Sequence, residues 1–144
     1  DRVLGPVRYN KIMDGMLSRF EYSKEGLAQR LLMDGSCLLR LQDEGHLIGL
    51  HSHTHPMSMA SLSASRQKEE YEANSRRLRS ILRVRPTAMS HPCNSYDPGT
   101  LAILKGLGVR LGFRANLAPV KERSELEYPR EDHANIMKMI EERV

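Results

Sequence analysis

The sequence predicts an α/β fold in which parallel strands are flanked by helices. Short apolar segments alternate along the chain with longer segments that carry apolar residues at helical spacing, and glycine or proline separates them. Such alternation is typical of a parallel sheet or barrel. With 144 residues, the chain fits one domain spanning residues 1–144.

The helices are predicted from apolar periodicity and from residues that favour helix ends. Ser63 is a good N-cap type, and Asp97-Pro98 is a strong helix-start signal. Pro86 and Gly108 end the helices that precede them. The predicted helices are residues 8–19, 24–33, 36–44, 63–83, 98–107 and 132–143. The predicted strands are residues 46–51, 87–91, 109–114 and 126–130.

Composition limits the kind of protein but does not identify it. Hydrophobic residues make up 40% of the chain and there is no Trp, which is low for a globular core and favours a piece of a larger domain. Cys37 and Cys93 are far apart and suggest no disulfide framework. There is no apolar run long enough to span a membrane and no signal-peptide core. The cellular compartment stays open.

The net charge of +4 comes largely from arginines near the end of one predicted helix, within residues 76–85. A basic helix face can contact nucleic acid or anionic lipid. A solvated face is the simpler interpretation, and we expect no nucleic-acid partner.

The most informative segment is His51-Ser52-His53-Thr54-His55-Pro56. Neutral imidazole is the commonest side-chain metal ligand, and such a cluster suits zinc or another divalent metal that prefers nitrogen. Pro56 biases His55 away from the α region, so a loop after the 46–51 strand is expected. His51 and His55 are then the candidate ligands, and His53 would point the other way.

This segment resembles the H-[ST]-x-x-H-P motif of the polysaccharide deacetylases, the NodB-homology domain of carbohydrate esterase family four. Further resemblances follow in the family's order. They are Glu44 to Gly49 before the motif, Ser90 to Asp97 at the next motif, Leu101 to Phe113 along a helix and strand, and Tyr128 to Asp132 at a late motif.

The resemblance implies a portion of a deformed (β/α) barrel that hydrolyses N- or O-linked acetyl groups on a polysaccharide or amino sugar. The cofactor would be a divalent metal held by His51 and His55, with zinc expected and cobalt or nickel as alternatives. The metal would polarise the acetyl carbonyl and activate a water. The peptide N–H groups after Pro92, that of Cys93 in particular, would hold the oxyanion.

The late motif supplies further candidates by the same resemblance. Arg130 would be an orienting charge near the site, and Asp132 a substrate contact beside it. The general acid has two candidates, His91 in the Pro92 loop and His133 after the late motif. For each of these histidines a structural role is the preferred interpretation, and the role of general acid is the alternative.

The chain also departs from the family pattern. The family's first motif carries two aspartates, a general base and a third metal ligand, and the early aspartates of this chain do not follow a strand. We therefore expect an incomplete domain, a weak metal binder and a poor catalyst. Cys93 and Asn94 replace the usual tyrosine and glycine.

Two rival interpretations stay open at this point. The first is an unrelated zinc hydrolase that uses the same histidines with Glu44 or Asp132 as third ligand. The second is a non-catalytic domain that binds a carbohydrate or, through the basic helix, an anionic partner.

Overall fold

The computed structural model describes residues 5–121 and 123–142. The chain divides into two compact units, Asp1–Arg40 and Leu41–Val144, with the boundary inside a helix. The sequence prediction of one domain over residues 1–144 stays a prediction. No described helix is long and apolar enough to cross a membrane.

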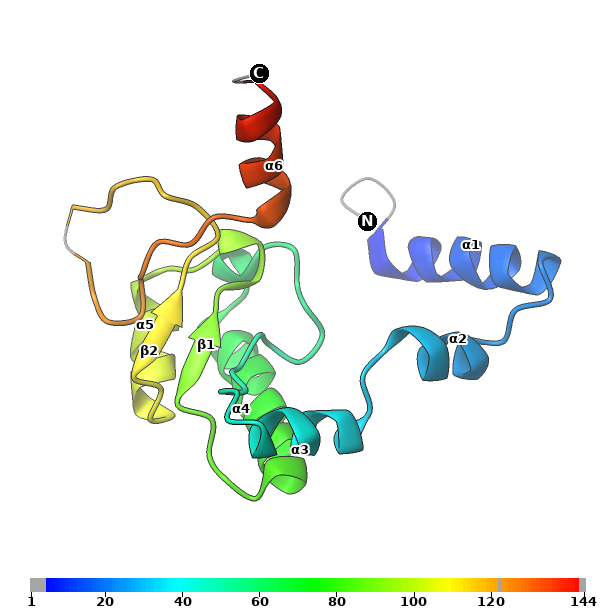
Figure 1. Ribbon diagram of the computed structural model, residues 1–144, viewed down its shortest axis with the longest axis horizontal. Coiled ribbons are helices and arrows are strands. Elements are labelled where there is room, and N and C mark those ends of the chain that lie inside the picture. The colour runs from blue at the N-terminus through cyan, green and yellow to red at the C-terminus, as the bar shows by residue number, and fades with distance from the viewer. Residues whose placement is uncertain (1–4, 122, 143–144) are drawn as a thin grey trace. The chain divides into compact units, whose positions relative to one another are not determined.

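The first unit consists of helices (Figure 1). They are α1 (Gly5–Arg19), α2 (Lys24–Leu31) and the start of α3 (Gly35–Asp43). Ser23 caps α2, because its hydroxyl accepts a hydrogen bond from the Gly26 N–H. None of the described residues before Leu50 is fully buried. The predicted helices 8–19, 24–33 and 36–44 are confirmed with shifts of a few residues at their ends.

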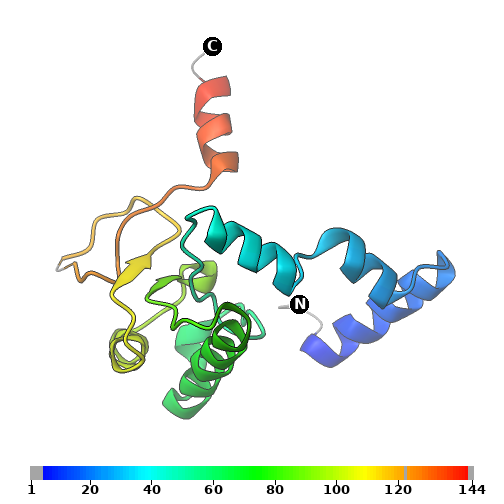
Figure 2. The same ribbon diagram turned by 60° about the horizontal axis from the view of Figure 1, so that its bottom comes forward.

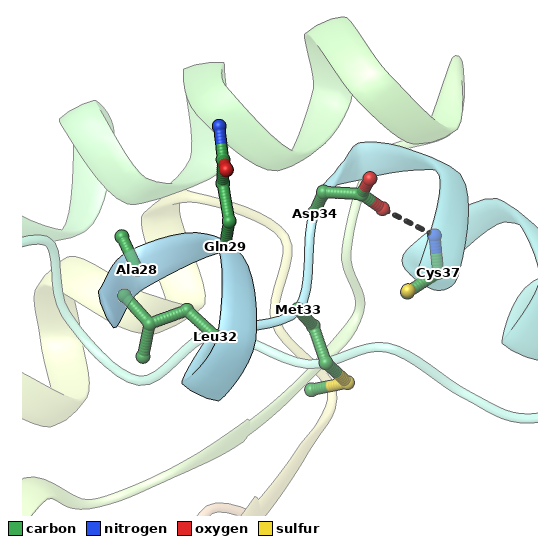
Figure 3. A pocket seen from close by; sticks show the side chains of 6 residues that line it. All are labelled: Ala28, Gln29, Leu32, Met33, Asp34 and Cys37. Carbon is green, nitrogen blue, oxygen red and sulfur yellow. Dashed lines mark hydrogen bonds between the residues drawn. The ribbon is translucent and has the colours of Figure 1, made fainter. Parts of the chain in front are cut away.

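Asp34 directly precedes α3 and lines a pocket of the first unit (Figure 3). Its Oδ1 accepts hydrogen bonds from the Cys37 N–H at 2.9 Å and from the Ser36 hydroxyl at 2.7 Å. These bonds lower the pKa of the Asp34 carboxyl to about 2. The carboxylate is therefore a helix cap, and the pocket has no second charged group.

The second unit is built on a parallel strand pair. In β1 (Ala88–Ser90) and β2 (Leu111–Phe113), Ala88 lies opposite Leu111 and Ser90 opposite Phe113. The helix α5 (Pro98–Gly106) connects these strands. A parallel pair needs such a crossover, so the predicted β–α–β alternation is confirmed here.

Two helices lie side by side on one face of this strand pair, α5 and α4 (Ala64–Leu82) (Figures 1 and 2). Ser63 caps α4 as predicted. Asp97 and Thr100 form a capping box at the start of α5. Between strands and helices lies an apolar core of Leu50, Met59, Tyr71, Leu78, Leu82, Ala88, Met89, Leu104, Val109 and Leu126.

The predicted strand 46–51 is wrong in extent, since its one ladder contact is a parallel bridge between Leu50 and Met89. The Leu50 N–H donates to Ala88 O, and the Ser90 N–H donates to Leu50 O. The next N–H, that of His51, donates to Asn74 Oδ1 of α4 instead. Ser52 then has a φ of 66°, which ends the extended backbone.

The predicted strand 126–130 is likewise reduced to one bridge, between Tyr128 and Phe113. Residues before it form a turn, in which the Glu127 N–H donates to Ser124 O. Pro129 after it has no N–H to continue the ladder. The last described element is α6 (His133–Glu141), which has no buried residue and confirms the predicted helix 132–143 over these residues, while residue 143 lies outside the described part of the chain.

Candidate metal-binding site

The histidine loop, residues 51–56, brings together the two candidate ligands that the sequence indicates, His51 and His55. The rings of His51 and His55 lie with their centroids 5.0 Å apart and their planes tilted by 53°. Both residues are exposed to solvent. The loop follows the Leu50 bridge and so lies at the carboxyl end of that extended segment, as the sequence predicts.

The ring orientation of His51 follows from one hydrogen bond. Its Nδ1 lies 2.8 Å from Ser90 O at the end of β1. A carbonyl oxygen only accepts, so Nδ1 carries the proton and Nε2 carries the free lone pair. Metal-binding histidines commonly donate their second ring N–H to a backbone carbonyl in this way.

His55 is brought next to His51 by a tight turn of left-handed residues. Ser52 has a φ of 66° and His55 a φ of 55°, values that cost energy in residues with a Cβ. The His55 N–H donates to the Ser52 hydroxyl at 3.2 Å, which closes the turn. Backbone strain of this kind persists where surrounding contacts over-determine the conformation.

Those contacts come from Glu70, a residue that the sequence interpretation missed. Its Oε2 accepts the N–H groups of His53 at 2.9 Å and Thr54 at 2.8 Å, and its Oε1 accepts the Thr54 hydroxyl at 2.7 Å. Burial raises the pKa of the Glu70 carboxyl, but the bonds from Thr54 and His53 together outweigh it, and the net pKa is lowered.

A sequence signal for Glu70 does exist. Gln67, Glu70, Tyr71 and Asn74 lie at helical spacing on one face of α4, and the first three are buried. Polar residues that share a face with buried apolar residues indicate bonds to another segment. Here Glu70 and Asn74 bond to the histidine loop, and Gln67 bonds to Leu62 O and Asp97.

His91, predicted as a general acid, is completely buried. Its Nε2 lies 2.8 Å from Leu126 O and therefore carries the proton, while its Nδ1 has no partner among the described residues. Its ring stacks on Tyr96 with centroids 4.1 Å apart. Burial lowers the pKa of His91 and favours the neutral ring. These contacts favour a structural role, and the catalytic role stays a prediction.

The Pro92 loop has the backbone form that glycine favours, although no glycine is present. Pro92 is buried in a short 3-10 turn, and Cys93 and Asn94 have φ values of 50° and 54°. Asn94 Oδ1 accepts the Ala115 N–H at 2.8 Å, which holds the turn. The Cys93 thiol is exposed, 3.8 Å from the Met57 sulfur. The oxyanion role of this loop stays a prediction.

The late-motif residues lie around the start of α6. Arg130 Nε donates to Arg114 O at 3.2 Å. The side chains of Asp132 and His133 are 57% and 91% exposed, with 3.4 Å between Asp132 Oδ1 and His133 Nδ1. The roles predicted for these three residues stay predictions.

Within residues 5–121 and 123–142, no three His, Cys, Asp or Glu side chains are grouped so that they could hold a metal. Neither Glu44 nor Asp132 therefore joins His51 and His55 as a third ligand. A catalytic zinc has three protein ligands and an open position. The two imidazoles suit zinc in donor type, but the described residues provide one ligand too few.

A largely apolar pocket lies beside His51 in the second unit. Backbone and side chains of the 47–51 segment, β1 and β2 form its walls. The lining residues are Leu47, Gly49, Leu50, His51, Ala88, Met89, Ser90, Leu111 and Phe113. A surface of this kind suits the apolar part of a small ligand.

The sequence profile described as Polysaccharide deacetylase matches residues 27–112, which include the histidine loop, β1 and α5. No curated protein sequence matches the chain.

Two solved structures share the fold. The Streptococcus pyogenes deacetylase PplD, solved in complex with acetate, is 21% identical with a TM-score of 0.63, over 74% of this chain and 48% of that one. The BpsB deacetylase domain from Bordetella bronchiseptica is 13% identical with a TM-score of 0.59, over 69% of this chain and 48% of that one. The chain thus spans about half the length of the solved structures it matches.

The predicted fold class is confirmed by this similarity: the parallel strands and flanking helices form a portion of a deformed (β/α) barrel. The profile match extends over more than half of the sequence. The chain belongs to the polysaccharide deacetylase family.

Proposed function

We propose that this chain carries part of the active site of a metal-dependent hydrolase that removes N- or O-linked acetyl groups from a polysaccharide or amino sugar. One observation supports the proposal above all. The rings of His51 and His55 lie side by side, and the bond from His51 Nδ1 to Ser90 O leaves Nε2 free to bind a metal.

His51 and His55 would hold a divalent metal, with zinc expected from two imidazole donors. When bound, the metal would polarise an acetyl carbonyl and lower the pKa of a water molecule. We place the remaining protein ligand outside the residues that the structure describes. We therefore expect residues 1–144 alone to bind metal weakly and to hydrolyse acetyl groups slowly.

The other candidates receive roles around this pair. The peptide N–H groups after Pro92, that of Cys93 in particular, would stabilise an oxyanion. Arg130 and Asp132 would orient the glycan, and His91 or His133 would give a proton to the leaving group. PplD was solved in complex with acetate, the product that deacetylation releases, which supports an acetyl group as the part of the substrate that reacts.

Acetate release tests the proposal. The complete protein, saturated with zinc, is incubated with N-acetylated and O-acetylated oligosaccharides, and acetate is measured against buffer. We expect release by the wild type and a loss of at least 100-fold in His51→Ala and His55→Ala. His53→Ala is the matched control, since its ring is exposed in the same loop and should be dispensable. Equal rates in wild type and His51→Ala would refute the proposal.

A second candidate is a non-catalytic carbohydrate-binding domain. The absence of a three-ligand group among the described residues favours it. It predicts that the complete protein binds an acetylated oligosaccharide without releasing acetate. Binding of unchanged strength after chelation of metal would support this candidate over the first.

A further inference from the structure

We infer that Glu70 is a positioning residue, whose carboxylate fixes the loop that places His51 and His55 side by side. The inference rests on the proposed function, because it concerns the same histidine pair. It adds a residue of α4, outside the histidine motif, on which metal binding depends.

The hydrogen bonds to the Glu70 carboxylate all come from the centre of the histidine loop. Glu70 is only 6% exposed, and its carboxylate accepts three hydrogen bonds, all from His53 and Thr54. Those two residues are the middle of the loop whose ends are the candidate ligands. Hydrogen bonds to a charged acceptor are about twice as strong as those between neutral groups. All three of these strong bonds hold the loop.

The loop needs such support because its conformation is unfavourable by itself. Ser52 and His55 are both left-handed, and free chains rarely adopt that form at residues with a Cβ. Without Glu70, two N–H groups lose their acceptor, and the left-handed turn loses the contacts that hold it. The two rings would then sample many separations, and the metal would have to order them on binding.

Asn74 extends the support by one helical turn. Its Oδ1 accepts the His51 N–H at 3.0 Å, so α4 holds the loop both at its first histidine and at its centre. Gln67, one turn before Glu70, is equally buried but bonds to Leu62 O, Asp97 and Thr100, away from the histidines. Gln67→Ala is therefore a matched control for damage to α4 itself.

Two substitutions of Glu70 distinguish its effect on the position of the histidines from its effect on the stability of the fold. Glu70→Leu fills a similar volume but accepts no hydrogen bond. Glu70→Gln keeps one oxygen for the two N–H groups and presents an amide N–H₂ to the Thr54 hydroxyl, which can act as acceptor. If Glu70 positions the histidines, metal affinity should fall in Glu70→Leu and return to near the wild-type value in Glu70→Gln.

The experiment titrates Co²⁺ alone into the complete protein and records the visible absorption of the bound ion. Outer contacts of metal ligands typically contribute 10–100-fold to metal affinity. We expect at least a tenfold weaker affinity in Glu70→Leu, near wild-type affinity in Glu70→Gln, and near wild-type affinity in Gln67→Ala. Wild-type Co²⁺ affinity in folded Glu70→Leu would overturn the inference, as would equal losses in Glu70→Leu and Gln67→Ala.

Hydrogen exchange of the His53 and Thr54 amides, measured without metal, keeps the two proposals distinguishable. Faster exchange at both amides in Glu70→Leu but not in Glu70→Gln supports positioning, even if the wild type binds no Co²⁺ and the proposed function fails. Unchanged exchange overturns it. If Glu70→Leu does not fold, Thr54→Val replaces it, because valine cannot donate to Glu70 Oε1. Faster amide exchange in Thr54→Val but not in Thr54→Ser, which keeps the hydroxyl, then supports positioning, and unchanged exchange overturns it.

Discussion

At the scale of single residues, hydrogen bonds decide which atoms are free to react. The ring of His51 presents Nε2 because Nδ1 is bonded to Ser90 O. The ring of His91 has its Nε2 bonded to Leu126 O in a fully buried position. Two histidines of neighbouring motifs thus have different environments, one open to solvent and one enclosed by the core.

The stabilisation of α3 by the Asp34 cap should depend on pH. Its pKa is lowered from 3.8 to about 2 by the bonds from Cys37 and Ser36. A lowered folded-state pKa means that the cap stabilises α3 fully above pH 3.8 and loses this effect as pH falls through about 2. We expect the Cys37 amide resonance, followed by NMR, to titrate with a midpoint near 2.

Asp34→Asn is the control for this titration. Asparagine also caps helices but does not ionise, so its Cys37 resonance should not change between pH 5 and pH 2. A wild-type midpoint at the ordinary aspartate value would show that the carboxylate does not cap α3.

At the scale of elements, β2 meets its neighbours closely because it contains a glycine. A Cβ on Gly112 would lie 2.5 Å from Leu126 O and 2.6 Å from Leu126 Cα. These are backbone atoms, which cannot move aside as a side chain can. The approach allows the Tyr128 N–H to donate to Gly112 O and the Gly112 N–H to donate to Glu125 O.

Gly112→Ala should therefore destabilise the second unit by about 2–3 kcal/mol, the cost of overpacking a tight site. Gly106→Ala is the matched control, because a Cβ there meets nothing within 4 Å and lies in helix α5. It should stabilise by about 0.5–1 kcal/mol. Urea unfolding of both variants measures the difference, and equal stabilities would contradict the close approach at Gly112.

The sequence predicts helices better than strands in this chain. Each described helix of four or more residues has capping residues or an apolar period that can be read locally. The segments at 46–51 and 126–130 have strand-like composition, but their pairing depends on distant partners. The His51 N–H bonds to Asn74, and Pro129 interrupts the ladder, so each segment keeps one bridge.

In the candidate site too, residues of a local motif could be predicted from the sequence, whereas residues that act from a distant segment could not. His51 and His55 lie only four positions apart in the sequence, so a local motif indicates them. Glu70 reaches the loop from 16 residues away, and its place on the face of α4 that carries the buried Tyr71 is the one signal that separates it from a solvated helix glutamate. Cys93 and Asn94 keep a left-handed backbone, a conformation that their identities alone do not suggest.

At the scale of the whole molecule, burial is unevenly divided between the two units. Every fully buried residue among those described lies at Leu50 or beyond. Segments with few buried contacts open most easily to solvent. We expect amides of α1 and α2 to exchange with solvent within seconds, and those of α4, β1 and β2 to exchange orders of magnitude more slowly.

Hydrogen–deuterium exchange with mass spectrometry checks this difference in residues 1–144. Peptides from residues 5–31 and from residues 64–113 are compared in one sample, so that pH and temperature are the same for both. Equal protection of the two regions would show that the first unit gains burial that its own helices do not provide.

The central claim is that His51 and His55 bind one divalent metal. Zinc K-edge X-ray absorption of the complete protein tests it most directly. We expect scattering from two imidazoles, with Zn–N distances of about 2.0–2.1 Å, and from a single imidazole in His51→Ala or His55→Ala. A wild type that retains no zinc, or a spectrum unchanged in both variants, would contradict the claim.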